Sequence, residues 1–214
     1  MKINLGCGQT PTLGWRNFDN SLSIKISHIP FLPKLLPRVR LLTQSQLEFV
    51  EFARKNCIEY ADVATKIPMK SGCCEVVYSS HMLEHLDREE ASRFLKEALR
   101  VLQPGGVIRL VVPDIFKHVT AYNDHGDANK FIESTHMCIH RPRTFYQRIR
   151  FLLVGTRHHQ WMYDGPSLSK LLESCGFVDV AVQGIGQTII AEPGALDLHE
   201  RSDESCYVEA SKPI

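Results

Sequence analysis

The sequence lacks the features that mark secreted, membrane-spanning and repetitive proteins. No apolar run reaches the roughly 18 residues needed to span a membrane, and the apolar stretch at 2–5 leaves no room for a signal peptide before it. The seven cysteines are odd in number and follow no repeated spacing, which argues against a disulfide framework and predicts a reducing, cytoplasmic environment. There is no internal repeat and no low-complexity tract. We therefore expect one globular domain over residues 1–214.

Acidic residues are missing from two long stretches of the chain, 21–47 and 134–163. Their nine Lys and Arg residues are Lys25, Lys34, Arg38, Arg40, Arg141, Arg143, Arg148, Arg150 and Arg157. The whole chain has 25 Lys and Arg against 24 Asp and Glu, so setting these nine aside leaves 16 cations against 24 acids. The two segments are thus basic and the rest of the chain is acidic. This uneven charge bears on binding partners rather than on the fold.

Where the sequence does carry a pattern, short apolar strands alternate with amphipathic helices. Strands are expected at 2–5, 15–19, 58–63, 75–80, 107–112, 177–182 and 205–210. Helices are expected at 43–55, 87–102 and 168–175. This alternation predicts a doubly wound α/β domain with a mostly parallel sheet and right-handed crossovers.

The helix expected at 87–102 has the clearest boundary signals. Asp87 and Glu90 have the spacing of a capping box, and an apolar stripe follows at helical spacing. Proline cannot continue the helical hydrogen-bond ladder and glycine permits a reversal, so Gln103-Pro104-Gly105-Gly106 is expected to end this helix. Gly176 is expected to follow the last turn of the helix at 168–175 for the same reason.

Three features suited to ligand binding stand at the ends of expected strands. Gly6 and Gly8 follow the first strand, where a side chain would block a ligand approaching the backbone. Asp19 ends the second strand, where Rossmann-type sites place a carboxylate on a ribose diol, and Asp62 ends the third. Open α/β sheets bind ligands at these strand ends, so the set indicates a nucleoside-containing cofactor. The alternative is a purely structural turn with two surface acids.

Four motifs in series make the chain resemble a known family. They are Asn4-Leu5-Gly6-Cys7-Gly8, Asp62-Val63, Ser79-Ser80-His81-Met82-Leu83-Glu84-His85-Leu86 and Arg100-Val101-Leu102-Gln103-Pro104-Gly105-Gly106. As a series they are similar to the methyltransferase type 11 group of class I S-adenosylmethionine-dependent methyltransferases. Within it the chain most resembles a branch associated with cell-surface polysaccharide synthesis, which shares stretches like Gly14–Asp19 and Tyr207–Pro213. The resemblance extends over most of the chain, less so over 21–57 and 115–157.

The resemblance implies a Rossmann-like sheet of seven strands in the order 3-2-1-4-5-7-6, the seventh antiparallel, with S-adenosylmethionine as cofactor. The first motif would bind the cofactor through Leu5, Gly6, Cys7 and Gly8, with the two glycines against its methionine and ribose portion. Asp19 would hold the ribose hydroxyls. The adenine would be bound by Asp62 and the Val63 amide, and the floor beside the reactive methyl group would be formed by Ser79, Ser80 and His81.

Two positions depart from the family pattern. Asn4 and Thr10 stand where the first motif has an acid and a third glycine, and Asn4 brings no charge to face the ammonium group of the cofactor. Gly8 and Asp19 are much closer in sequence than the roughly twenty residues of the dinucleotide fingerprint, so the first crossover helix is expected to be very short or missing. The same spacing argues against a dinucleotide-dependent dehydrogenase.

Two histidine patterns raise the alternative of a metal site. His81-x-x-Glu84-His85 matches the HxxEH pattern of one metalloprotease class, which needs both histidines on one helical face and a third ligand. Because the pattern directly follows a strand and runs into the Asp87 cap, it predicts a loop, which disfavours a zinc hydrolase, and we expect no metal. The pairs His136/His140 and His158/His159 have arginines among them, which favours an anion-facing surface. A non-catalytic protein that keeps only the fold is a further alternative.

The expected chemistry is an in-line displacement in which the cofactor supplies the electrophile and the protein aligns the acceptor. A hydroxyl acceptor would be helped by a base. His81 is the first candidate because imidazole titrates near physiological pH, and Asp114 and Glu84 are held in reserve. The alternative for His81 is an ordinary, hydrogen-bonded loop histidine.

The acceptor is expected to meet two cover segments, 21–42 and 115–163. The first combines cations with apolar residues and prolines, and the second interleaves arginines with aromatic residues. We hypothesise a small-molecule acceptor or a glycan- or lipid-linked one, anionic in character, which would be compatible with peripheral membrane contact. Nucleic acid is not expected because the net charge is balanced. Equally open is packing of these segments on each other or on a second subunit.

Overall fold

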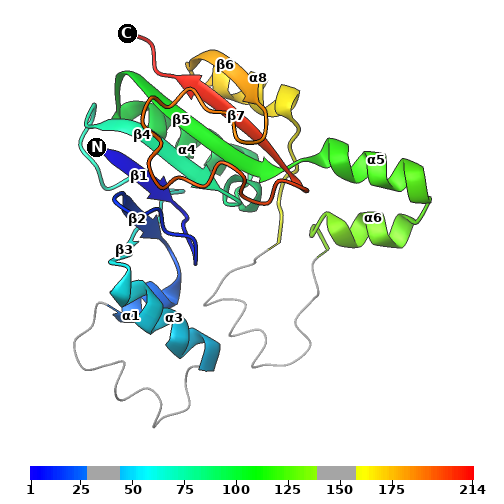
Figure 1. Cartoon of the computed structure of the whole chain (residues 1–214), viewed down its shortest axis with the longest axis horizontal. Helices are drawn as coiled ribbons and strands as arrows, with labels where there is room; N and C mark the ends of the chain where they lie inside the picture. The colour runs from blue at the N-terminus through cyan, green and yellow to red at the C-terminus, as the bar shows by residue number, and fades with distance from the viewer. Residues whose placement is uncertain (28–43, 139–157) are drawn as a thin grey trace.

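A computed structural model of the chain describes residues 1–27, 44–138 and 158–214, and shows a seven-stranded sheet (Figure 1). The strands are β1 (Lys2–Leu5), β2 (Arg16–Asp19), β3 (Glu59–Tyr60), β4 (Cys74–Ser80), β5 (Leu102–Pro113), β6 (Val178–Gln183) and β7 (Ser205–Ser211). Their order is β3-β2-β1-β4-β5-β7-β6, with β7 antiparallel to both of its neighbours and the other pairs parallel. The predicted Rossmann-like α/β class and strand order are confirmed.

The described helices alternate with these strands. They are α1 (Leu22–Ser27), α3 (Gln44–Lys55), the 3-10 turn η1 (Leu83–His85), α4 (Arg88–Val101), α5 (Ile115–His125), α6 (Ala128–Ser134) and α8 (Gly165–Ser174). Asp87 caps α4 in the predicted capping box, accepting from the Glu90 amide while the Glu90 side chain accepts from the Asp87 amide. Gly176 follows α8 with a φ of 96°, as expected. Thr43, predicted to open α3, lies outside the described residues.

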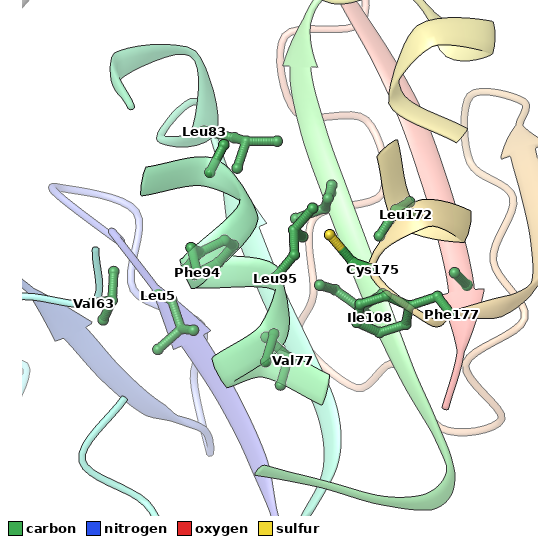
Figure 2. Packing of buried hydrophobic residues seen from close by; sticks show 14 of the residues in the cluster. Leu5, Val63, Val77, Leu83, Phe94, Leu95, Ile108, Leu172, Cys175 and Phe177 are labelled. Carbon is green, nitrogen blue, oxygen red and sulfur yellow. The ribbon is translucent and has the colours of Figure 1, made fainter. Parts of the chain in front are cut away.

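One face of the sheet is covered by α4 and α8. Phe94 and Leu95 of α4 are fully buried over strand residues such as Leu5, Val77 and Ile108 (Figure 2). Leu172 of α8 and Cys175, the C-cap residue of that helix, join the same cluster (Figure 2). The apolar stripe of α4 therefore packs the helix against the strands that end in the glycine loop and in the Ser-Ser-His motif. The N-terminus of α4 is thereby held near the end of β4.

The opposite face of the central strands is covered by an irregular segment, residues 184–204. Val76, Tyr78, Val111 and Tyr207 alternate with the residues of the other face, as strand geometry requires, and pack with Ile190 and Leu196. The fully buried pair Arg109–Glu209, with nitrogen and oxygen 2.7 Å apart, ties this segment down. Arg109 donates to the Gln187 carbonyl, and Glu209 accepts from Thr188 and the Ile189 amide.

Two details differ from the expectations, and a third agrees with them. The third strand is limited to Glu59–Tyr60, because the chain turns at 62–65 instead of continuing along β2. Gln103–Gly106 follows the end of α4 as predicted, but this stretch already belongs to β5. The ten residues between β1 and β2 contain no helix, so the predicted missing crossover is confirmed.

The predicted cover segments are described only in part. Residues 28–43 and 139–157 lie outside the described residues, and with them most of the basic side chains on which that prediction depends. The rest includes α5 and α6, which project from the body of the sheet and bury no residue of their own (Figure 1). No helix in the described part of the chain is long and apolar enough to cross a bilayer.

Candidate active site

The strand register brings the predicted motif residues to one edge of the sheet. Leu5 at the end of β1 lies opposite Phe18 of β2 and opposite Ser79 of β4. Asp19 lies opposite Tyr60 at the end of β3. Because these strands are parallel, their carboxyl ends meet there, which is where open α/β sheets bind ligands.

The loop after β1 is held in a fixed shape by backbone hydrogen bonds. The amides of Gly6 and Cys7 both donate to the Phe18 carbonyl, at 2.8 and 3.0 Å. Asn4 is buried, and its amide nitrogen donates to the Thr10 carbonyl and to the Thr12 hydroxyl, each at 3.1 Å. The asparagine that replaces the family's acid therefore holds the loop, and its carboxamide oxygen has no partner among the described residues.

The two glycines of this loop are required for different reasons. Both have positive φ, 72° at Gly6 and 49° at Gly8. A Cβ on Gly6 would lie 2.6 Å from the Met82 Cγ, whereas a Cβ on Gly8 would enter open space. Gly6 therefore permits close packing against the loop after β4, and Gly8 leaves room at the edge of the sheet where a cofactor would lie.

Asp19 accepts a hydrogen bond on each carboxylate oxygen, one from this loop and one from the residue two positions after it. Oδ2 accepts from the Gly8 amide at 3.0 Å, and Oδ1 accepts from the Ser21 amide at 2.8 Å. Each oxygen keeps a second lone pair, so the half-buried carboxylate can still accept from ribose hydroxyls. Burial, and then the charge of Asp19, raise the pKa of the Cys7 thiol to about 12, so this loop cysteine stays protonated.

Asp62 lies next to this site, because the Ala61 amide donates to the Asp19 carbonyl at 3.0 Å. The Asp62 carbonyl accepts from the amides of Thr65 and Lys66, which form the turn that ends the third strand. Its carboxylate accepts no hydrogen bond within the described part of the chain, and Val63 is buried in the core beside it. The residues present thus fit an adenosyl group between two aspartates over a glycine loop.

Ser79, Ser80 and His81 continue from β4 at the same edge. The Ser79 hydroxyl donates to the Leu5 carbonyl at 2.9 Å, and the buried Ser80 hydroxyl has no partner among the described residues. His81 has a φ of 48°, unusual for a residue other than glycine, and its amide donates to the Val111 carbonyl. Its side chain is only 8% exposed.

Arg201 and Ser205 hold the His81 imidazole from a distant part of the chain. Nε2 lies 2.8 Å from the Ser205 hydroxyl, and Nδ1 lies 3.2 Å from Arg201 Nη1. A guanidinium group only donates, so Nδ1 accepts and Nε2 carries the proton that is donated to Ser205. Sequence reasoning did not find either partner, because they are 120 and 124 residues away and carry no motif.

Glu84 is the second chemical group of this loop. Its side chain is 1% exposed, and neither carboxylate oxygen has a hydrogen-bond partner among the described residues. Oε1 lies 3.5 Å from His81 Nδ1 and 3.9 Å from His159 Nε2. Burial lowers the pKa of His159 to about 4, so this imidazole is neutral at pH 7.

Asp114 lies at the end of β5, as predicted, but its carboxylate caps the N-terminus of α5. Oδ1 accepts from the Phe116 amide at 3.0 Å, so Asp114 is the N-cap of α5. The HxxEH pattern lies on the predicted loop, where His81 precedes the single turn of η1. The two histidines therefore do not share one face of an α-helix, as the metalloprotease pattern requires.

Comparisons with known proteins agree with this fold. The family model described as a methyltransferase domain matches residues 3–110, which is half of the chain. A SAM-dependent methyltransferase from Methanosarcina mazei is similar in structure, with a TM-score of 0.54 and 17% identity over 99% of this chain and 92% of that one. A SAM-dependent methyltransferase from Thermotoga maritima, described as a possible histamine N-methyltransferase, gives 0.52 and 15% over 99% and 81%. No curated protein matches the sequence.

The strand order and the glycine loop with its aspartates define a Rossmann-like domain that binds a nucleoside cofactor. The chain belongs to the methyltransferase domain family. It is an S-adenosylmethionine-dependent methyltransferase, and this decides against the zinc hydrolase and the non-catalytic alternatives. The link to polysaccharide synthesis stays a prediction.

Proposed function

We propose that this enzyme transfers the methyl group of S-adenosylmethionine to a hydroxyl group of a small anionic acceptor, with His81 as the general base. The observation that carries the proposal is the position of His81 at the end of β4, next to the cofactor edge. Its left-handed backbone is a strained conformation that persists only where the surroundings hold it, and such residues cluster at active sites.

The hydrogen bonds of His81 support this role. With the proton on Nε2 and donated to Ser205, the lone pair of Nδ1 is available to an acceptor. The side chain of Arg201, which is 56% exposed, donates to that lone pair and lies 3.5 Å from Glu204 Oε1, so it has to move to an incoming anion before Nδ1 can act as the base. When bound at this edge, S-adenosylmethionine would supply an electrophilic methyl group, and His81 would take the proton of the attacking hydroxyl group. The hydroxyl proton passes to Nδ1.

We assign the cofactor contacts as the resemblance implied. The loop formed by Leu5, Gly6, Cys7 and Gly8 would bind the methionine and ribose portion of the cofactor. Asp19 would bind the ribose hydroxyls. Asp62 and the Val63 amide would bind the adenine. Ser79 and Ser80 would form the floor. The open space at Gly8 and the free lone pairs of Asp19 support this assignment.

The cations beside His81 support an anionic acceptor. Arg201 touches the imidazole, and the Lys117 ammonium donates to the carbonyls of Ser202 and Ser205 at 2.7 and 2.9 Å. The cations of Arg201 and Lys117 therefore lie close to His81 and to its partner Ser205. A phosphate-linked sugar or a lipid-linked glycan would combine a hydroxyl group with the expected charge. The seven free cysteines support a cytoplasmic location.

Calorimetric titration with S-adenosylhomocysteine tests the cofactor site without an acceptor. Saturable binding at one site per chain is expected, and no binding at millimolar concentration would refute the assigned pocket. The acceptor is then sought by transfer of a labelled methyl group to sugar phosphates and to the matching neutral sugars. Greater transfer to the phosphorylated member of each pair is expected.

His81→Ala tests the base. We expect turnover to fall by about 100-fold or more, the usual contribution of a general base, while the affinity for S-adenosylhomocysteine stays within about threefold. Equal turnover would remove His81 from the mechanism. Arg201→Gln should raise KM for a charged acceptor, whereas Arg93→Gln, an exposed arginine on the outer side of α4, should leave it unchanged.

A further inference from the structure

We propose that Glu84, His85 and His159 form a binding site for a divalent transition-metal ion of the zinc class, next to His81. One ligand atom from each of the three residues lies within 4.8 Å of the other two. Two imidazoles and one carboxylate are the donor set that zinc prefers. The proposal does not depend on the identity of the methyl acceptor.

The buried carboxylate of Glu84 is the main observation in favour of a bound cation. It is 1% exposed and has no hydrogen-bond partner in the described residues, although buried charges are almost always paired or bound to metal. The nearest nitrogens, at 3.5 Å on His81 and 3.9 Å on His159, are too far for a hydrogen bond.

The spacing fits ligands around an ion better than it fits a direct pair. Zinc ligands lie about 2.1 Å from the metal, so two of them in a tetrahedral arrangement stand about 3.4 Å apart. Glu84 Oε1 and His159 Nε2 are 3.9 Å apart, a gap that small side-chain movements would close around a metal. Three protein ligands would leave a fourth position for water or for an oxygen of the acceptor.

His85 is prepared for ligation by a hydrogen bond of its other ring nitrogen. His85 Nδ1 lies 3.2 Å from the His158 carbonyl, and donating its proton there leaves Nε2 with a free lone pair. The rings of His85 and His159 pack edge to face, with centroids 5.1 Å apart. A hydrogen bond from one ring nitrogen to a carbonyl is the usual way in which proteins fix the tautomer of a metal-binding histidine.

The backbone brings His159 to this place from 74 residues further along the chain. The amides of Gln160 and Trp161 both donate to the Glu84 carbonyl, at 2.7 and 3.2 Å. The His159 amide donates to the His136 carbonyl at 3.1 Å. The cluster is therefore set by main-chain hydrogen bonds rather than by a chance contact of side chains.

This site differs from the metalloprotease arrangement that the HxxEH pattern suggested. There the two histidines of the pattern bind zinc and the glutamate is the base. Here the glutamate is itself a ligand, the first histidine is held by Ser205, and the third ligand comes from the segment after residue 157.

The test is a calorimetric titration of tag-free, full-length protein, stripped with a chelator, with zinc chloride. One ion per chain is expected, and the cobalt form should show the visible absorption bands of a four- or five-coordinate site. Glu84→Gln, His85→Gln and His159→Gln should each weaken zinc binding more than about 100-fold, since even indirect contacts to metal ligands change affinity by 10- to 100-fold. Circular dichroism verifies that each variant is folded.

His125→Gln is the matched control, because His125 is an exposed histidine at the end of α5. It should bind zinc as the unaltered protein does. The proposal is overturned if stoichiometric zinc binding is absent, if the three folded variants bind as tightly as the control, or if only magnesium binds. None of these results bears on binding of S-adenosylhomocysteine, so this proposal and the proposed function fail separately.

Discussion

Asp19 and Glu84 are two carboxylates at the same edge of the sheet, and their surroundings are opposite. Asp19 is half-buried and accepts from two backbone amides, one on each oxygen. Glu84 is almost fully buried and accepts none within the described residues. The first carboxylate is positioned by the protein before any ligand arrives. The second has no such partners there, which is the surrounding expected of a carboxylate that binds a cation.

The local chain explains the difference. Asp19 ends a strand and faces a tight loop, and its carboxylate accepts from the Gly8 amide of that loop and from the Ser21 amide just after the strand. Glu84 lies on the single turn of η1, which buries its side chain, while its own carbonyl accepts from two amides of another segment. The cofactor side of the site is thus built from neighbouring backbone, and the Glu84 side is built from distant side chains.

The largest expected effect comes from removing the carboxylate of Asp19. Asp19→Ala should weaken S-adenosylhomocysteine binding by several hundred-fold, about 3–4 kcal/mol, because two hydrogen bonds to a charged group are lost and two amides are left unpaired. Calorimetry measures the change. Asp124→Ala, an exposed acid on α5, is the control and should bind normally. A loss below tenfold would mean that Asp19 organises the loop without binding the ribose.

The next effect is on stability. It concerns the contact between the loop after β1 and the loop after β4, where Gly6 packs against Met82. Gly6→Ala should lower the free energy of unfolding by about 2–3 kcal/mol, because a Cβ would combine positive φ with a 2.6 Å contact to Met82. Gly8→Ala has the same sign of φ but meets open space, and should cost only about 1 kcal/mol. Chemical denaturation measures both. Equal losses would show that backbone strain alone decides.

A smaller effect tests the buried carboxylate of Glu84. In metal-free protein, Glu84→Gln should raise the free energy of unfolding by about 1–2 kcal/mol, because an amide replaces a buried carboxylate that has no hydrogen-bond partner in the described residues. Glu89→Gln, an exposed carboxylate on α4, should stay within about 0.5 kcal/mol of the parent. Added zinc should stabilise the parent protein and not Glu84→Gln. A destabilised Glu84→Gln variant in chelator would contradict the comparison.

The smallest effect is on reactivity and leaves the fold unchanged. Burial and the charge of Asp19 raise the pKa of Cys7 to about 12, so its reactive thiolate is scarce at pH 8. Mass spectrometry after brief alkylation should find the exposed Cys57 and Cys138 modified and Cys7 intact. Rapid labelling of Cys7 in folded protein would show that the loop opens and that its backbone is less fixed than the hydrogen bonds indicate.

Periodicity and capping predicted most of the fold correctly. The capping box at Asp87 and the short connection between Gly8 and Asp19 are properties of neighbouring residues, so the sequence shows them directly. The end of β3 was predicted too far along the chain because a turn competes with the strand at Asp62. The irregular cover at 184–204 has no periodic signal at all, since it is held by a buried ion pair between strands.

The amino-acid sequence by itself determined the alternation of strands and helices, the glycine loop, and the carboxylates at the strand ends. These depend on residues near each other in the chain. Only the tertiary structure decided that Arg201 and Ser205 hold His81, and that His159 faces Glu84. Those partners are set by how the sheet brings distant segments to one edge, and a residue's local neighbours carry no record of such contacts.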